Sequence, residues 1–112
     1  MSANHTMTSD RVEQEFTILN HLGMHARPAA EFVRCARRFK SRIEILVRGK
    51  RFSAQRLLEV LLAGLHAGSR FQLVAEGPDA RSALDTLGSL LRRQAEAEKA
   101  LAAESDSGRW KD

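Results

Sequence analysis

Residues 23–30, which read GMHARPAA, place a histidine, an arginine and a proline close together. Pro28 lacks an N–H and is tolerated only in the first turn of a helix, so we expect a helix to begin within a residue or two of it. His25 would then lie where a loop becomes a helix. Free N–H groups and the positive dipole end suit such a terminus to a dianionic phosphoryl group, and the guanidinium of Arg27 adds planar donors. The segment therefore indicates phosphate chemistry at His25, with the backbone of Ala26 and Arg27 as further phosphate donors.

Four roles compete for His25. As a plain loop histidine it would need no partner, but nothing apolar around it demands burial. A metal site with His21 would span a glycine loop without a third Cys, Asp or Glu ligand nearby, so we predict no metal. A general base would want a carboxylate, a nucleophilic serine or a metal, and the segment offers none. The remaining role is that of a nucleophile, which accepts a phosphoryl group and gives it away.

Hydrophobic periodicity predicts the elements that position this segment. Alternation predicts strands, and apolar residues at intervals of three and four predict helices. Ser53 is expected to cap the second helix from Ala54, and Asp79 the third, which could extend past Glu98. The order strand, helix, strand, strand, helix, strand, helix predicts an α+β domain with helices on one face of a mostly antiparallel sheet. The expected strands cover residues 15–20, 43–48, 51–53 and 71–76.

Length and composition predict one small soluble domain. The chain has 112 residues, 43% of them hydrophobic, and no apolar run approaches the roughly 20 residues that cross a bilayer. With Cys35 as the only cysteine and no secretory signal at the start, we expect a cytoplasmic protein without disulfides or membrane insertion. Residues 1–14 are predicted to be a flexible extension, and residues 99–112 a helical extension with a tail that frays from Ser105.

The positive charge is concentrated in the middle of the chain. The net charge is +4, and residues 15–76 carry eleven Arg and Lys against five Glu. An anionic substrate or partner should therefore be sought there. Nucleic acid is one hypothesis, but the chain has only five Phe and one Trp, without a stacking pair near the basic residues.

The segment GMHARPA at residues 23–29 resembles the active-site motif of the HPr phosphocarriers of the bacterial phosphoenolpyruvate-dependent phosphotransferase system. The resemblance continues through Gly49-Lys50, Gly64-Leu65, Gly68 and AEG at 75–77 with Asp79, and covers about residues 15–95. It implies an open-faced β-sandwich, with a four-stranded antiparallel sheet and three helices on one face. We place this HPr-like domain at residues 15–98.

The resemblance also implies a function. His25 would accept a phosphoryl group on Nδ1 from phosphorylated enzyme I and pass it to a histidine of an EIIA-type protein. Arg27 would stabilise the phosphate. The protein would be a monomeric carrier with a transient phosphohistidine rather than a stand-alone enzyme, and would need no cofactor.

The resemblance further suggests a docking surface around the histidine and the leucine-rich second helix. Core packing remains an alternative for each leucine. The candidate docking residues are Met24, Arg34, Arg56, Leu57, Leu58 and Leu61.

One position departs from the family pattern. Arg56 stands where many members carry a regulatory serine, six positions after the lysine of the Gly-Lys turn, so no regulatory serine is expected. A second hypothesis is therefore a regulatory paralogue that reports nitrogen or carbon status without sugar transport.

Overall fold

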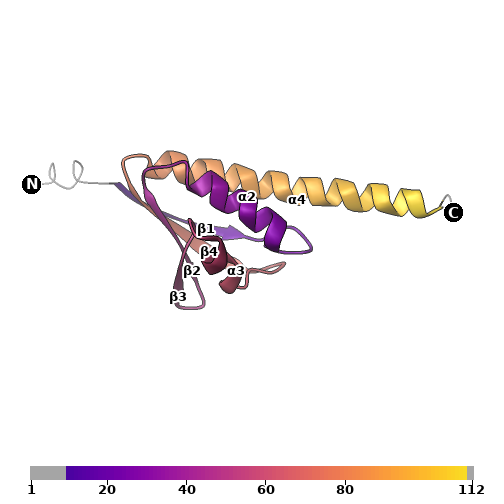
Figure 1. The fold of residues 1–112 in the computed structure, drawn as a ribbon, viewed down its shortest axis with the longest axis horizontal. Coiled ribbons are helices and arrows are strands. Elements are labelled where there is room, and N and C mark those ends of the chain that lie inside the picture. Colours follow the sequence, from indigo (N-terminus) through magenta and orange to yellow (C-terminus); the bar gives the residue numbers. More distant parts are fainter. Residues whose placement is uncertain (1–9, 111–112) are drawn as a thin grey trace, which may run out of the picture.

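The computed structural model describes the backbone of residues 10–110 and the side chains of residues 10–103. Residues 10–110 fold into four strands and three helices in the predicted order (Figure 1). These elements are β1 (Asp10–Thr17), α2 (Ala26–Ala36), β2 (Arg42–Val47), β3 (Lys50–Ser53), α3 (Leu57–Leu62), β4 (Arg70–Gly77) and α4 (Ala80–Trp110).

The four strands form one antiparallel sheet in the order β1-β4-β2-β3. Strands β2 and β3 are joined by a tight turn at Arg48 and Gly49, whose φ angles are 51° and 74°. Two consecutive positive φ angles match the right-handed twist of a hairpin. The helices lie on one face of the sheet and leave the other face open (Figure 1). The predicted α+β open-faced sandwich is therefore confirmed.

The core lies between the sheet and its helices. The alternating residues Phe71, Leu73 and Ala75 of β4 point into it, as period 2 predicts. Spacings of three and four place one face of α2 and one face of α4 against the sheet. The helical core residues are Ala29, Phe32, Val33 and Ala36 of α2 and Ala80, Ala83, Leu84, Leu87 and Leu90 of α4.

Strand β1 begins at Asp10, so the expected start at Glu15 is wrong, and residues 10–14 belong to the sheet rather than to a flexible extension. Most side chains of β1 are exposed, so no alternation marks its first half. Backbone pairing defines the strand instead, with Asp10 opposite Gly77 and Thr17 opposite Arg70. Residues 1–9 of the predicted extension lie outside the described residues.

Helix α3 begins at Leu57, so the expected start at Ala54 behind a Ser53 cap is wrong. The Ser53 hydroxyl accepts a hydrogen bond from the amide of Gln55, which forms a local turn. The Gln55 side chain donates to the carbonyls of Ala36 and Ser41 at 3.1 and 3.0 Å. These long-range bonds keep the chain extended until Arg56, which is the N-cap residue of α3.

Asp79 precedes α4, and its carbonyl accepts a hydrogen bond from the amide of Ala83 at 2.9 Å, as expected of a residue that caps this helix, but its carboxylate binds the α2–β2 connection. It accepts hydrogen bonds from the amides of Lys40 and Ser41, both at 2.9 Å, and from the Ser41 hydroxyl at 2.6 Å. The Ser41 hydroxyl and these amides hold the pKa of Asp79 below its ordinary value. Asp79 thus ties the start of α4 to the start of β2.

Helix α4 runs past Glu98, as predicted, and continues to Trp110. The extension expected from residue 99 is thus helical as far as Trp110, and Lys111 and Asp112 lie outside the described residues. Within the described part of the chain, no helix has the combined length and apolar character needed to span a membrane.

Candidate functional site

His25 is the N-cap residue of α2 and has an exposed side chain. Its backbone is extended, with φ −81° and ψ −176°, and its imidazole makes no capping hydrogen bond. Its carbonyl accepts the first intrahelical bond, from the amide of Ala29 at 2.9 Å. The amides of Ala26 and Arg27 precede that bond and are the donors that a helix start leaves without intrahelical partners. The imidazole, these amides and the exposed Arg27 guanidinium therefore share one helix end, as predicted.

The loop before His25 is held by a close approach at Gly23. Its φ of 74° lies in the left-handed region, and a Cβ there would come within 2.7 Å of the Cα of His66. The amide of Met24 donates to the carbonyl of Leu65 at 2.8 Å. The Asn20 side chain donates to the Gly23 carbonyl at 2.7 Å. Only glycine fits this position without strain, and the close contact fixes where the chain enters α2.

Met24 was predicted to be a docking residue, and its burial contradicts this prediction. Only 6% of it is exposed, and it packs in the core cluster. A side chain buried in the core cannot meet a partner unless the loop moves. Met24 therefore anchors the loop from below, while His25, the next residue, faces solvent.

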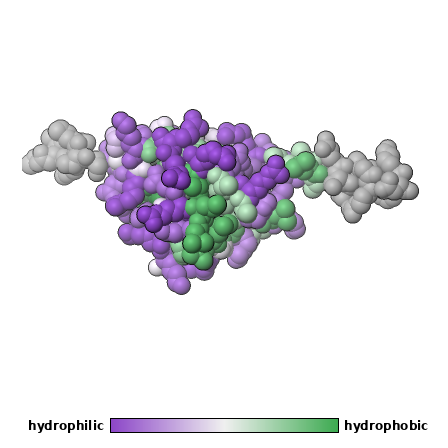
Figure 2. Space-filling model, in the orientation of Figure 1, coloured by the Kyte–Doolittle hydropathy of each residue, from purple (hydrophilic) through white to green (hydrophobic). Residues whose placement is uncertain are grey.

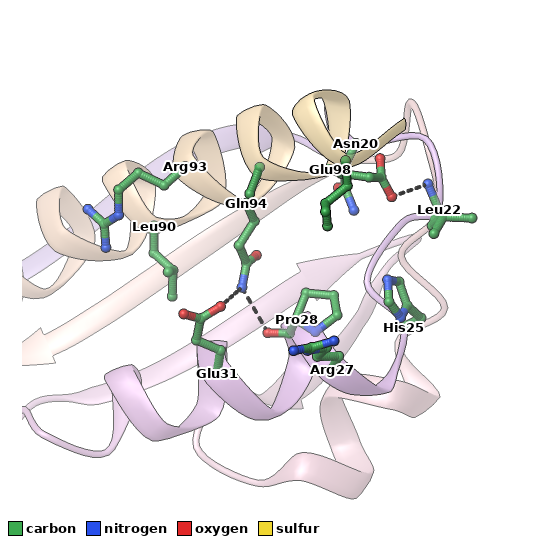
Figure 3. Close-up of a pocket in the computed structure, with 12 residues that line it drawn as sticks. Asn20, Leu22, His25, Arg27, Pro28, Glu31, Leu90, Arg93, Gln94 and Glu98 are labelled. Carbon is green, nitrogen blue, oxygen red and sulfur yellow. Dashed lines mark hydrogen bonds between the residues drawn. The ribbon is translucent and has the colours of Figure 1, made fainter. Parts of the chain in front are cut away.

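A groove of about 520 Å³ lies between the first turn of α2 and the later part of α4 (Figure 3). His25, Arg27 and Pro28 contribute to one wall, whereas Leu90, Gln94 and Glu98 of α4 contribute to the other. His25 therefore borders the groove, and its side chain remains exposed to solvent.

No sequence pattern indicated that two residues of this groove, Gln94 and Glu98, contact the segment around His25. Gln94 donates to the carbonyl of Pro28 and to the Glu31 carboxylate, both at 3.0 Å. The carboxylate of Glu98 accepts from the amides of His21 and Leu22 at 2.5 and 3.0 Å. The partners lie 63 to 77 positions away in the chain, so no local spacing predicts these contacts.

His21, the other histidine weighed for a metal site, has an exposed side chain and contributes its backbone amide to the contact with Glu98. Within the described residues, no three or more His, Cys, Asp or Glu side chains gather where they could hold a metal ion.

The leucines of α3 lie on the surface rather than in the core. Leu57, Leu58 and Leu61 are 41%, 68% and 38% exposed, and Leu62 also faces solvent. Figure 2 shows a hydrophobic patch at the position of α3, surrounded by hydrophilic surface. Val60, which is buried, fastens the helix to the core. We call Leu57, Leu58, Leu61 and Leu62 the leucine patch.

The two arginines predicted for docking are also on the surface. Arg34 is exposed on α2, and α2 contacts α3. Arg56 is exposed at the N-cap of α3, and its guanidinium lies 3.9 Å from the Glu59 carboxylate. That ion pair is long and exposed, so it leaves the Arg56 charge available to a partner.

An open-faced antiparallel sheet, three helices and an exposed N-cap histidine beside an arginine define a small domain suited to carrying a group on its imidazole. Residues 12–93 match the family model described as the PTS HPr component phosphorylation site. The chain therefore belongs to the HPr phosphocarrier family of the phosphotransferase system.

Individual relatives agree with this assignment. The chain is 40% identical to the phosphocarrier protein HPr of Lysinibacillus sphaericus over 78 residues, covering 70% of this chain and 89% of that protein. It is 38% identical to the HPr of Treponema pallidum over 81 residues, covering 72% and 92%.

Solved structures agree as well. The crystal structure of the phosphocarrier protein HPr from Bacillus anthracis superposes with a TM-score of 0.69 at 32% identity, covering 71% of this chain and 95% of that one. Crh, the Bacillus subtilis catabolite repression containing protein, superposes with a TM-score of 0.60 at 30% identity, covering 75% and 97%.

Proposed function

We propose that this protein accepts a phosphoryl group on His25 from phosphorylated enzyme I and passes it to a histidine of an EIIA-type protein. The observation that carries the proposal is the exposed imidazole at the N-cap of α2, free of any capping bond and next to Arg27. Membership of the family supports the general phosphocarrier role. The two partners and the individual roles of the residues belong to the proposal.

The proposed chemistry needs little from the protein beyond position and charge. The lone pair on Nδ1 of neutral His25 attacks the phosphorus, and the bond between phosphorus and the donor breaks as the new N–P bond forms. A second transfer reverses these roles, with the acceptor histidine as nucleophile. The charge on the transferring phosphoryl oxygens is stabilised by Arg27 and by the amides of Ala26 and Arg27, which are already oriented by the helix.

Exposure of His25 follows from this chemistry. Donor and acceptor are both proteins, and each must bring its own reacting atom in line with the phosphorus. A closed pocket would block one of these encounters. We infer that a monomer presents His25 to each partner in turn and that the leucine patch, with Arg34 and Arg56, provides the docking surface.

The test is phosphorylation by phosphoenolpyruvate and enzyme I, followed by intact mass and an acid-lability assay. The wild-type protein should gain one acid-labile phosphoryl group, and His25→Ala should gain none. The matched control is His21→Ala, which removes an exposed imidazole four residues away, whereas its backbone contact with Glu98 can remain. An unmodified wild-type protein, beside an enzyme I that phosphorylates its own cognate carrier, would show that the proposal is wrong.

The docking surface has a separate test. Leu58→Ala should raise the KM for enzyme I or for the EIIA-type acceptor several-fold and leave kcat nearly unchanged, since a contact residue contributes to binding and not to the transfer. Gln72→Ala is the control, because Gln72 is exposed on β4 rather than on a helix. An unchanged KM with both partners would remove Leu58 from the docking surface.

A second candidate is a regulatory carrier that reports nitrogen or carbon status without sugar transport. The observation in its favour is Arg56, an exposed cation at the position expected for a regulatory serine, together with the structural likeness to Crh. Presenting the phosphorylated protein to sugar-specific and to regulatory EIIA-type proteins distinguishes the two. Transfer to a sugar-specific EIIA supports the transport role, and transfer to a regulatory one alone supports this candidate.

A further inference from the structure

The later part of α4 lies beside the proposed phosphoryl site but outside the family match, which ends at residue 93. Gln94 and Glu98 are four positions apart, so they share one face of the helix. Figure 3 shows both side chains extending from α4 toward the segment that contains His25. Each makes two hydrogen bonds to that segment.

Glu98 holds the loop that leads into His25. One carboxylate oxygen accepts from the amide of His21 and the other from the amide of Leu22. Bonds from amides to a carboxylate are stronger than those between neutral groups. The Glu98 side chain is half-buried, and both bonds lie at the surface of the molecule. The loop backbone three residues before His25 is therefore fixed to α4.

Gln94 holds the first turn of α2 on the other side of His25. Its side-chain amide donates to the carbonyl of Pro28, three residues after His25, and to the carboxylate of Glu31. His25 thus lies midway between two points that a single turn of α4 fastens.

We propose that Glu98 and Gln94 are positioning residues for the phosphoryl transfer, and this proposal rests on the proposed function of His25. They hold the imidazole and the amides of Ala26 and Arg27 in the arrangement in which one phosphoryl group can meet all of them. A small misplacement of a reacting group can cost a large factor in rate. Loss of either side chain should therefore slow the transfer more than it weakens binding of the partner proteins.

The first measurement uses the unphosphorylated protein and does not depend on its function. Amide hydrogen exchange, followed by NMR, should show the His21 and Leu22 amides exchanging about tenfold faster in Glu98→Ala, because two bonds to a carboxylate are lost. Glu96→Ala is the matched control. Glu96 lies two residues before Glu98 on the same helix, and its exposed side chain carries the same charge. It should leave both amides unchanged.

The second measurement is steady-state phosphorylation of the full chain by enzyme I. Glu98→Ala should lower kcat about three- to tenfold with a smaller change in KM. Gln94→Ala should lower kcat less, because only one of its two bonds has a carboxylate as acceptor, whereas both bonds of Glu98 involve its carboxylate. Glu98→Gln should restore part of the rate, since its side-chain carbonyl still accepts a bond from the loop. Glu96→Ala should match the wild type.

The outcomes separate the two proposals. If the wild type is phosphorylated and Glu98→Ala is phosphorylated at the same rate, the positioning role is wrong, whatever the exchange data show. Unchanged exchange at His21 and Leu22 would also overturn it, because the loop would not depend on Glu98. If the wild type itself is never phosphorylated by an active enzyme I, the proposed function of His25 fails instead.

Discussion

The two parts of α4 differ in what they contact, although they form one continuous helix. Five hydrophobic residues of the first part, from Ala80 to Leu90, are buried against the sheet and α2. Among residues 92–103 no side chain is buried, and the polar contacts from Gln94 and Glu98 reach the segment around His25. The first part stabilises the fold, and the second part contacts the site. One helix can therefore serve two purposes that separate mutations should distinguish.

The largest effect on the free energy of unfolding should come from a substitution in the buried first part of α4. Leu84 is fully buried, and Leu84→Ala should lower the free energy of unfolding by about 2–5 kcal/mol, since it removes apolar contacts and leaves a cavity. Leu101, which is 64% exposed, is the counterpart in the second part, and Leu101→Ala should change the same quantity by less than about 0.5 kcal/mol. Urea denaturation of both variants makes the comparison. Equal losses would mean that α4 is one structural unit throughout.

An intermediate effect is expected at the loop that the second part of α4 holds. Gly23→Ala should cost roughly 1–3 kcal/mol of stability, because a non-glycine residue is strained at φ 74° and its Cβ would collide with the backbone of His66. It should also slow phosphorylation of His25 by displacing the entry into α2. Gly49→Ala is the matched control for the backbone term, because φ is again 74° but nothing lies within 4 Å of the added Cβ. If Gly23→Ala lowers the free energy of unfolding no more than Gly49→Ala does, the close contact with His66 adds nothing to the loss of stability.

The smallest effect should come from Asp79, which anchors the beginning of the first part. Its pKa is lowered in the folded protein, chiefly by the hydrogen bond from the Ser41 hydroxyl. A lowered folded-state pKa contributes stability above the unfolded-state pKa, and this contribution is lost as pH falls through the folded-state value. The free energy of unfolding should therefore fall more steeply below about pH 4 in the wild type than in Asp79→Asn. Urea titrations at a series of acid pH values measure this free energy for both proteins. If it depends on pH in the same way in both, Asp79 is not a source of the acid sensitivity.

The sequence predicted the elements whose side chains alternate between core and solvent. The strand from Ile43 and the helix after Pro28 both have apolar residues at regular spacing, and both form close to where they were expected. The first half of β1 was missed because its residues are mostly exposed, so that only its pairing with β4 defines it. The start of α3 was missed because the Gln55 side chain bonds to Ala36 and Ser41, which no local pattern reveals.

The site divides in the same way. The placement of His25 and Arg27 at the start of a helix could be predicted from the sequence, because Pro28 lies within three residues of both. The sequence could not show that Leu57, Leu58 and Leu61 are exposed, since leucines at this spacing can form either a core face or a surface patch. In the structure, Val60 is the residue of α3 that is buried. Met24 was misplaced because burial of a loop residue depends on what lies beneath the loop.

The position of β4 in the sheet also constrains the order in which the protein can assemble. Strand β4 pairs with both β1 and β2, and only β2 and β3 are partners that lie close together in the chain. During synthesis the β2–β3 hairpin can form early, but β1 has no strand to pair with until residues 70–77 have left the ribosome. Because such distant pairings must pay loop-closure entropy first, the sheet should close late and cooperatively. A nascent chain that ends before β4 would therefore expose β1 and the edge of β2 to other proteins in the cell.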